Sequence, residues 1–272
     1  MKMKANKRMS RMAYKLFLTA FTLLLFGACA NAQGLSGTES GKSSPIEITA
    51  DDALEWRRAE NIYVARGNAQ AQQGETRINA AVLKAHYRDD ANGNTSIWKV
   101  EAENNVTITS PDGVVKGARG VYLVSEGRAE LTGGNLSATG ENMSVTAEES
   151  LQYFTNENKF MAVGNAVASE PGRSITGDTL TAWTKADGGG LDRAEADGNV
   201  VIKTETETAT GNRATYDADT SIAELTGDVK VVQGKNELEG VRATVNLETG
   251  VSQMFGEQGG GRVKGLFFPS SE

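Results

Sequence analysis

The sequence predicts an all-β protein built from about six to seven stacked repeats of roughly 30 residues, with antiparallel strands. The composition favours short extended segments, because 31 glycines and four prolines interrupt the 272 residues and aromatic residues make up only 6%. Apolar and polar residues alternate with a period of two, as in Val106-Thr107-Ile108-Thr109, which is typical of strands with one buried face. About three strands of five to eight residues would fit each repeat, on the order of 18–20 in all.

Two landmarks define the repeat. The first is an apolar residue, any residue and a small residue, and it begins at Ile48, Ile78, Val115, Val145, Ile175, Ala209 and Leu238. The second is a Gly-Asn pair or a close variant, interpreted as a turn, and it occupies 67–68, 104–105, 134–135, 164–165, 198–199 and 227–228. Glycine and asparagine suit positions where the backbone needs a positive φ.

The spacing of the landmarks is constant in one direction. From each turn Asn or Asp to the next apolar–x–small start is ten residues in every case, which predicts a short strand, a tight turn and entry to the next strand. All length variation falls in the other half, where 89–96 and 186–190 are interpreted as loops. A unit this short cannot bury its own apolar face, so stacked units would share one apolar interior and leave strand edges free at both ends.

Residues 1–32 are interpreted as a cleaved secretory signal, followed by a flexible linker at 33–44. Six basic residues and no acid precede an apolar run over 16–28, and Ala30-Asn31-Ala32 favours cleavage after Ala32. The run would rise only about 20 Å as a helix, less than a bilayer core of about 30 Å, so an uncleaved anchor is the weaker alternative. Cys29, the only cysteine, lies in a weak lipobox-like context and would be removed with the signal.

The charge and the reactive residues limit the function. Removing the signal leaves 22 basic and 35 acidic residues, a net charge of −13, which makes nucleic acid an unsuitable partner and leaves acyl chains as the part of any lipid that could be held. The only histidine, His86, has no nucleophile at a characteristic spacing. We therefore expect no enzyme activity, no catalytic residues, no metal and no cofactor.

Several segments in one register carry a resemblance to a known family. They are 45–51 (PIEITAD), 67–74 (GNAQAQQG), 78–80 (INA) and 225–234 (LTGDVKVVQG). This series resembles the OstA-like family of lipopolysaccharide-transport proteins, with the domain at 45–257 and a glycine-rich link and apolar C-terminal strand at 258–272. The resemblance implies an elongated, twisted, open β-jellyroll with an apolar groove.

The resemblance also implies a role in the periplasm. Copies would bind lipopolysaccharide by its lipid A acyl chains, associate head to tail, and form a bridge from inner to outer membrane. The partners would be lipopolysaccharide, a second copy, and the inner- and outer-membrane components of the export machinery. Three alternatives stay open: an inner-membrane-anchored member of the same pathway, a detached copy of the related domain of the outer-membrane translocon, and a structural β-solenoid that binds no ligand.

Eight residues are candidates for the lipid groove. The resemblance implies that the first strand contributes Ile46 and Ile48. The alternation pattern adds Val64, Ile78, Val106, Ile108, Phe160 and Val229. Each could equally be an ordinary core residue.

Overall fold

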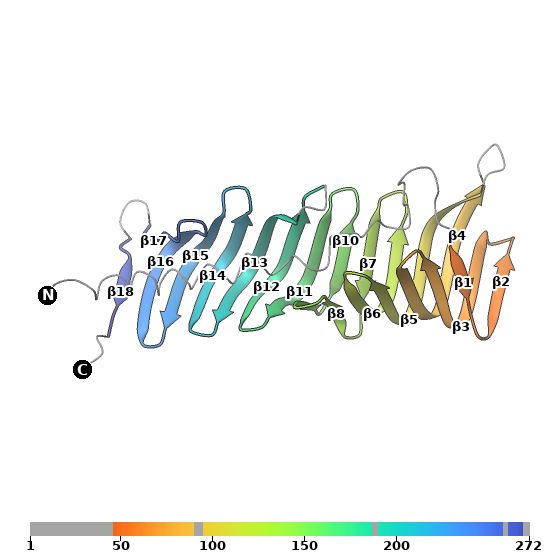
Figure 1. The fold of residues 1–272 in the computed structure, drawn as a ribbon, viewed down its shortest axis with the longest axis horizontal. Coiled ribbons are helices and arrows are strands. Elements are labelled where there is room, and N and C mark those ends of the chain that lie inside the picture. The colour runs from red at the N-terminus through yellow and green to blue at the C-terminus, as the bar shows by residue number, and fades with distance from the viewer. Residues whose placement is uncertain (1–45, 90–94, 187–189, 258–260, 269–272) are drawn as a thin grey trace. The chain divides into compact units, whose positions relative to one another are not determined.

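The structure, a computed structural model, describes residues 46–89, 95–186, 190–257 and 261–268. These residues form eighteen strands and no helix, which confirms the all-β prediction (Figure 1). None of the described segments is a helix that could span a membrane. The predicted signal, the linker and parts of both predicted loops (90–94 and 187–189) lie outside the described residues.

The chain divides into two compact units. The described part of the N-terminal unit is 46–89, 95–163 and 184–186. Its strands are β1 (Glu47–Thr49), β2 (Ala53–Arg57), β3 (Ile62–Gln73), β4 (Thr76–Asp89), β5 (Thr95–Ser110), β6 (Gly113–Leu123), β7 (Arg128–Thr132), β8 (Leu136–Thr139), β9 (Ser144–Ala147), β10 (Ser150–Phe154) and the start of β11 (Lys159–Glu170).

The described part of the C-terminal unit is 164–183, 190–257 and 261–268. It contains the rest of β11 together with β12 (Arg173–Thr184), β13 (Leu191–Thr204), β14 (Glu207–Asp217), β15 (Ile222–Gln233), β16 (Asn236–Asn246), β17 (Ser252–Phe255) and β18 (Lys264–Leu266). The last of these strands lies within the segment for which the sequence predicts an apolar terminal strand.

Successive strands pair with their neighbours in sequence. In the N-terminal unit, β3, β4, β5 and β6 form antiparallel pairs in chain order, and β1 and β2 both pair with β3. In the C-terminal unit, β13 to β16 pair in the same way, and β17 and β18 both pair with β16. Each long strand therefore has two halves, and at the ends of the series each half can be paired by a separate short strand.

Five of the six Gly-Asn pairs are bulges inside strands, which corrects their interpretation as turns, whereas the pair at 134–135 lies between β7 and β8. Gly67 and Asn68 have φ of 79° and 42°, yet they lie within β3, where the register with β4 shifts between Arg66 and Ala69. Similar shifts accompany 104–105, 198–199 and 227–228. The left-handed backbone expected at these positions is confirmed, but it bends a strand and does not end it.

This bulge also corrects the predicted strand length. The strands β3, β4 and β5 contain 12, 14 and 16 residues, longer than the five to eight predicted, whereas β7 to β10 contain only four or five. Hydrogen bonding resumes after every bulge, because only the bulged residues fall out of register.

The constant ten-residue step is a tight hairpin, as the sequence predicts. Within this hairpin, the residue that follows the bulge pairs directly with the small residue of the next landmark. Ala69 pairs with Ala80 in this way, and Val106 pairs with Gly117. A Cβ atom at Gly117 would lie 3.0 Å from Cδ2 of Leu136. The small residue therefore leaves room for a large side chain from a neighbouring strand.

The core of each unit consists mainly of small and aliphatic residues from one face of these strands. In the N-terminal unit, Leu83 on β4 lies opposite Ala65 and Ala102, while Leu131 lies opposite Leu151, and all five are buried. In the C-terminal unit, Leu225 and Ala243 form a buried pair of the same kind.

Candidate functional site

In the N-terminal unit, the strand register aligns apolar residues from seven strands in one row. Direct partners in an antiparallel pair have their side chains on the same face. The chain of partners runs from β1 to β9 through Ile48, Ala71, Ile78, Ile108, Val115, Ala138 and Val145. We call these seven residues the apolar row. Those from Ile48 to Val115 are partly exposed, and the last two are buried.

Five of the eight candidate residues lie on the face of the apolar row. Ile48, Ile78 and Ile108 are members of it. Val106 lies two residues before Ile108, next to the bulge, and is only 1% exposed. Ile46 lies two residues before Ile48 and is 40% exposed. Exposure therefore increases from the bulge toward the outer end of this face.

The other three candidates lie elsewhere. Val64 is fully buried and shares its face with its direct partners Glu55 and Lys84, opposite to the face of Ala65. Phe160 lies near the start of β11, before the Gly-Asn pair at 164–165, and its direct partner is Tyr153 on β10. Val229 belongs to the C-terminal unit, where it pairs with Gly240.

The C-terminal unit has a corresponding row, none of whose members is in the candidate list, although Val229 lies two residues before its member Val231. Its successive partners are Ile202, Ala209, Val231, Leu238 and Gly265. We call these residues the C-terminal row. The sequence repeat could have identified both rows. Apart from Gly265, each member is either the first residue of an apolar–x–small landmark or the third residue after the Asn or Asp of a Gly-Asn-like pair.

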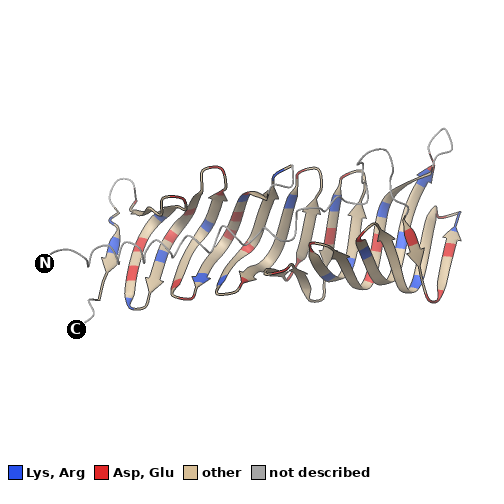
Figure 2. Ribbon diagram, in the orientation of Figure 1, with Lys and Arg blue, Asp and Glu red and all other residues tan. Residues whose placement is uncertain are grey.

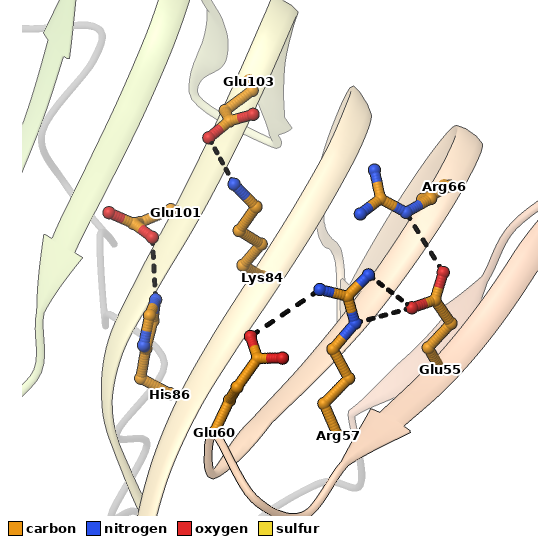
Figure 3. Close-up of polar contacts among 8 residues, drawn as sticks. All are labelled: Glu55, Arg57, Glu60, Arg66, Lys84, His86, Glu101 and Glu103. Atoms are coloured by element: carbon orange, nitrogen blue, oxygen red, sulfur yellow. Dashed lines mark hydrogen bonds and ion pairs between the residues drawn. The ribbon is translucent and has the colours of Figure 1, made fainter.

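The face of Val64 carries a network of ion pairs (Figure 3). Glu55 lies 2.7 Å from Nη2 of Arg57 and 3.2 Å from Nε of Arg66, and Lys84 lies 2.7 Å from Glu103. The hydrogen bond from Arg57 lowers the pKa of Glu55. Glu55 and Lys84 are the direct strand partners of Val64, so these charged side chains share its face.

His86 belongs to the same network. Its Nε2 atom lies 2.7 Å from Oε2 of Glu101, which also pairs with Lys99. Burial opposes ionisation of Glu101, but the hydrogen bonds from Lys99 and His86 outweigh it, and its pKa is lowered. This histidine is therefore one member of a polar network on the same strand face.

Charged residues of both signs are interspersed along the strands of each unit (Figure 2). Within the described ranges, no three His, Cys, Asp or Glu side chains are arranged to hold a metal ion. Glu207, at the start of β14, differs from the others because burial raises its pKa to about 7. It lies on the same strand face as Ala209, beside the C-terminal row.

These features define a class of β-repeat proteins in which the strand register aligns apolar residues into rows. A model of the family described as LptA/(LptD N-terminal domain) LPS transport protein matches residues 47–159 and again 149–251. The chain therefore belongs to this family of lipopolysaccharide transport proteins, in agreement with the OstA-like resemblance and with a transport role in place of an enzymatic one. The first match lies within the N-terminal unit, and the second begins in that unit and extends through most of the C-terminal one.

One solved structure with similarity to the chain is that of LptH, the LptA-homologous periplasmic component of the conserved lipopolysaccharide transport device from Pseudomonas aeruginosa. The sequences are 14% identical, the match covers 83% of this chain and 96% of that chain, and the TM-score is 0.22. No curated protein sequence matches the chain.

Proposed function

We propose that this protein is a periplasmic carrier that holds the acyl chains of lipopolysaccharide against the apolar row and passes them from inner to outer membrane. The observation that carries the proposal is the apolar row itself, because seven strands contribute hydrocarbon side chains to it without a polar interruption. Membership of a lipopolysaccharide transport family supports the choice of cargo.

The chemistry of the row suits a moving cargo. Burying an acyl chain contributes about 0.8 kcal/mol per CH₂ group, so several chains would be held firmly. Contacts between hydrocarbons have no preferred direction, and moving along the row exchanges one set for a similar one. The lipid can therefore shift from strand to strand without breaking hydrogen bonds.

The proposal includes head-to-tail assembly of copies into a bridge. Figure 1 shows β1 and β2 at one end of the N-terminal unit, and both pair with β3 through different halves of that strand. Strands at the end of a sheet can be extended by a strand from another chain. A second copy or a membrane-bound component of the export machinery would add there.

Photo-crosslinking tests the lipid contact directly. A photo-reactive residue at Ile108 should capture lipopolysaccharide in living cells, whereas one at Thr107 should not, because adjacent strand residues have opposite faces. Equal capture at the two positions, or none at Ile108, would overturn the assignment of the row. Ile48 provides a second probe at the outer end of the same row.

The location is tested separately by the processing of the N-terminus. The proposal requires a mature protein that begins at Gln33 and is released with the periplasmic fraction. A full-length chain retained in the inner membrane would favour the anchored member of the same pathway.

A further inference from the structure

The C-terminal row ends on a residue without a side chain. Leu238 on β16 lies directly opposite Gly265 on β18, and this pair continues the series Ile202, Ala209 and Val231. The next position on the apolar face is thus a bare backbone, where every preceding strand contributes an aliphatic or alanine side chain.

The ring of Phe267 lies at this position. A Cβ atom on Gly265 would be 2.7 Å from Cε2 of Phe267 and 3.3 Å from Cδ2 of Leu238. The aromatic ring therefore lies over Gly265 and beside the last aliphatic side chain of the row. It is nevertheless 66% exposed.

Polar contacts on both sides hold the segment that carries the ring. Before it, Nζ of Lys264 lies 3.1 Å from Oε2 of Glu239, and after it the backbone N–H of Phe268 donates to Oδ1 of Asn236 at 2.9 Å. Both partners are on β16, to which β18 is also paired. The exposed ring is therefore placed by its surroundings.

We propose that Phe267 is the terminal acyl-chain contact of the C-terminal unit, the point at which the hydrocarbon of the cargo leaves the row. This inference rests on the proposed function and extends it to a residue outside the candidate list. The ring continues a face made of hydrocarbon side chains, so the matching ligand is hydrocarbon. An added strand would instead pair with the backbone of β18, whose last residue is Leu266.

A pair of neighbouring phenylalanines provides a matched experiment. Phe268 is 53% exposed, similar to Phe267, but its backbone N–H bonds to Asn236 and it follows Phe267 by one residue. Full-length protein with benzoylphenylalanine at 267 or at 268 would be irradiated in cells, and lipopolysaccharide adducts would be detected by immunoblot. We expect clearly more lipid adduct at 267 than at 268, because only the ring at 267 lies over Gly265 beside the last aliphatic side chain of the row.

Two results would overturn the inference. One is equal lipid capture at 267 and 268, and the other is capture of a second copy of the chain in place of lipid at 267. The Ile108 probe distinguishes failure of the terminal contact from failure of the proposed function. Lipid at Ile108 but not at 267 rejects the terminal contact alone, whereas no lipid at either position rejects the proposed function as well.

A substitution that moves the ring gives an independent readout. Gly265→Ala places a methyl group where the ring now lies, and Phe267→Ala removes the ring. Each should reduce binding of radiolabelled lipopolysaccharide by the purified protein about five- to tenfold, while Phe268→Ala should not. Circular dichroism melting identifies any variant that fails to fold. Unchanged binding by folded Phe267→Ala would contradict the inference.

Discussion

Ile78 on β4 lies directly opposite Ile108 on β5, and the two side chains share one face of the N-terminal unit. Ile78 is also the direct partner of Ala71, and Ile108 is the direct partner of Val115. The constant hairpin length explains the pairs Ala71–Ile78 and Ile108–Val115, because each ten-residue step fixes which residues of one hairpin meet. The pair Ile78–Ile108 lies across the variable connection between β4 and β5, so it depends on the hydrogen-bond register of these two strands.

The first prediction concerns the middle of the apolar row. Replacing Ile78 by Asp puts a carboxylate among the partners Ala71 and Ile108, where a charge loses solvation without a counterion. We expect lipid capture by a photo-reactive probe at Ile108 to fall about tenfold or more. Thr109→Asp is the control, because Thr109 is exposed and lies on the opposite face of β5. Similar losses in both variants, at equal unfolding midpoints, would contradict a lipid contact specific to the row.

The second prediction concerns the bulges. Gly198 has φ of 74°, and a Cβ there would overlap the side chain of Asp178, which accepts hydrogen bonds from the side chain of Asn199. Gly234 has φ of 59° in a hairpin but has nothing within 4 Å of a Cβ. Gly234→Ala should cost about 1 kcal/mol from the backbone alone, and Gly198→Ala about 2 kcal/mol or more, because it also disturbs packing.

Urea unfolding of the two glycine variants measures this difference. The comparison isolates the contact with Asp178, since both positions impose the left-handed conformation on alanine. Equal losses of unfolding free energy would mean that Asp178 moves aside without cost.

The third prediction concerns pH. Burial raises the pKa of Glu207 from 4.5 to about 7, so between these values the folded state holds a proton that the unfolded state has lost. The free energy of unfolding should therefore decrease as the pH rises from about 4.5 to about 7, and level off above that range. Glu207→Gln, which resembles the protonated form, should lose this dependence and be more stable than the wild type at pH 8.

Urea midpoints at pH 5 and pH 8 test the assignment to Glu207. Glu205→Gln is the matched control, because it removes an exposed carboxylate from the same hairpin. Parallel pH profiles for the wild type and Glu207→Gln would show that another group causes any pH dependence.

The fourth prediction concerns assembly. Ile46 is 40% exposed and immediately precedes β1, at the end of the N-terminal unit. Under the bridge proposal, Ile46→Asp should shorten concentration-dependent oligomers, since a charge there opposes apolar contact with a second copy. Thr49→Asp, on the opposite face of β1, should have a smaller effect. Light scattering that finds only monomers of the wild-type protein at high concentration would reject head-to-tail assembly.

Much of the fold could be predicted from local sequence, and the failures have a physical cause. The repeat, the tight hairpins and the left-handed Gly-Asn positions follow from spacing and backbone sterics. The pairs at 67–68 and 198–199 nevertheless resemble turns in the sequence, because the same left-handed residues occur in two-residue hairpins and in bulges. Local sequence does not distinguish a strand that bends from a strand that ends.

The sequence predicts only part of the candidate site, because an alternating pattern draws attention to large apolar residues. Ile78 and Ile108 stand out in such a pattern, but Ala71 and Ala138 do not. Val64 fits the alternation equally well, yet its partners are Glu55 and Lys84. After a bulge the alternation changes phase, so a pattern read straight through it no longer identifies one face.

Residue types and their spacing are enough to predict a series of β-hairpins with a fixed ten-residue step and left-handed bends, because these properties depend only on neighbouring residues. The position of Ile48, Ile78 and Ile108 in one row, and of the Phe267 ring over Gly265, follows only from the folded chain. Those relationships depend on hydrogen-bond register between strands and on the path of the chain after its last strand. Alternation with a period of two looks the same for either face, and it acquires a direction only when strands pair.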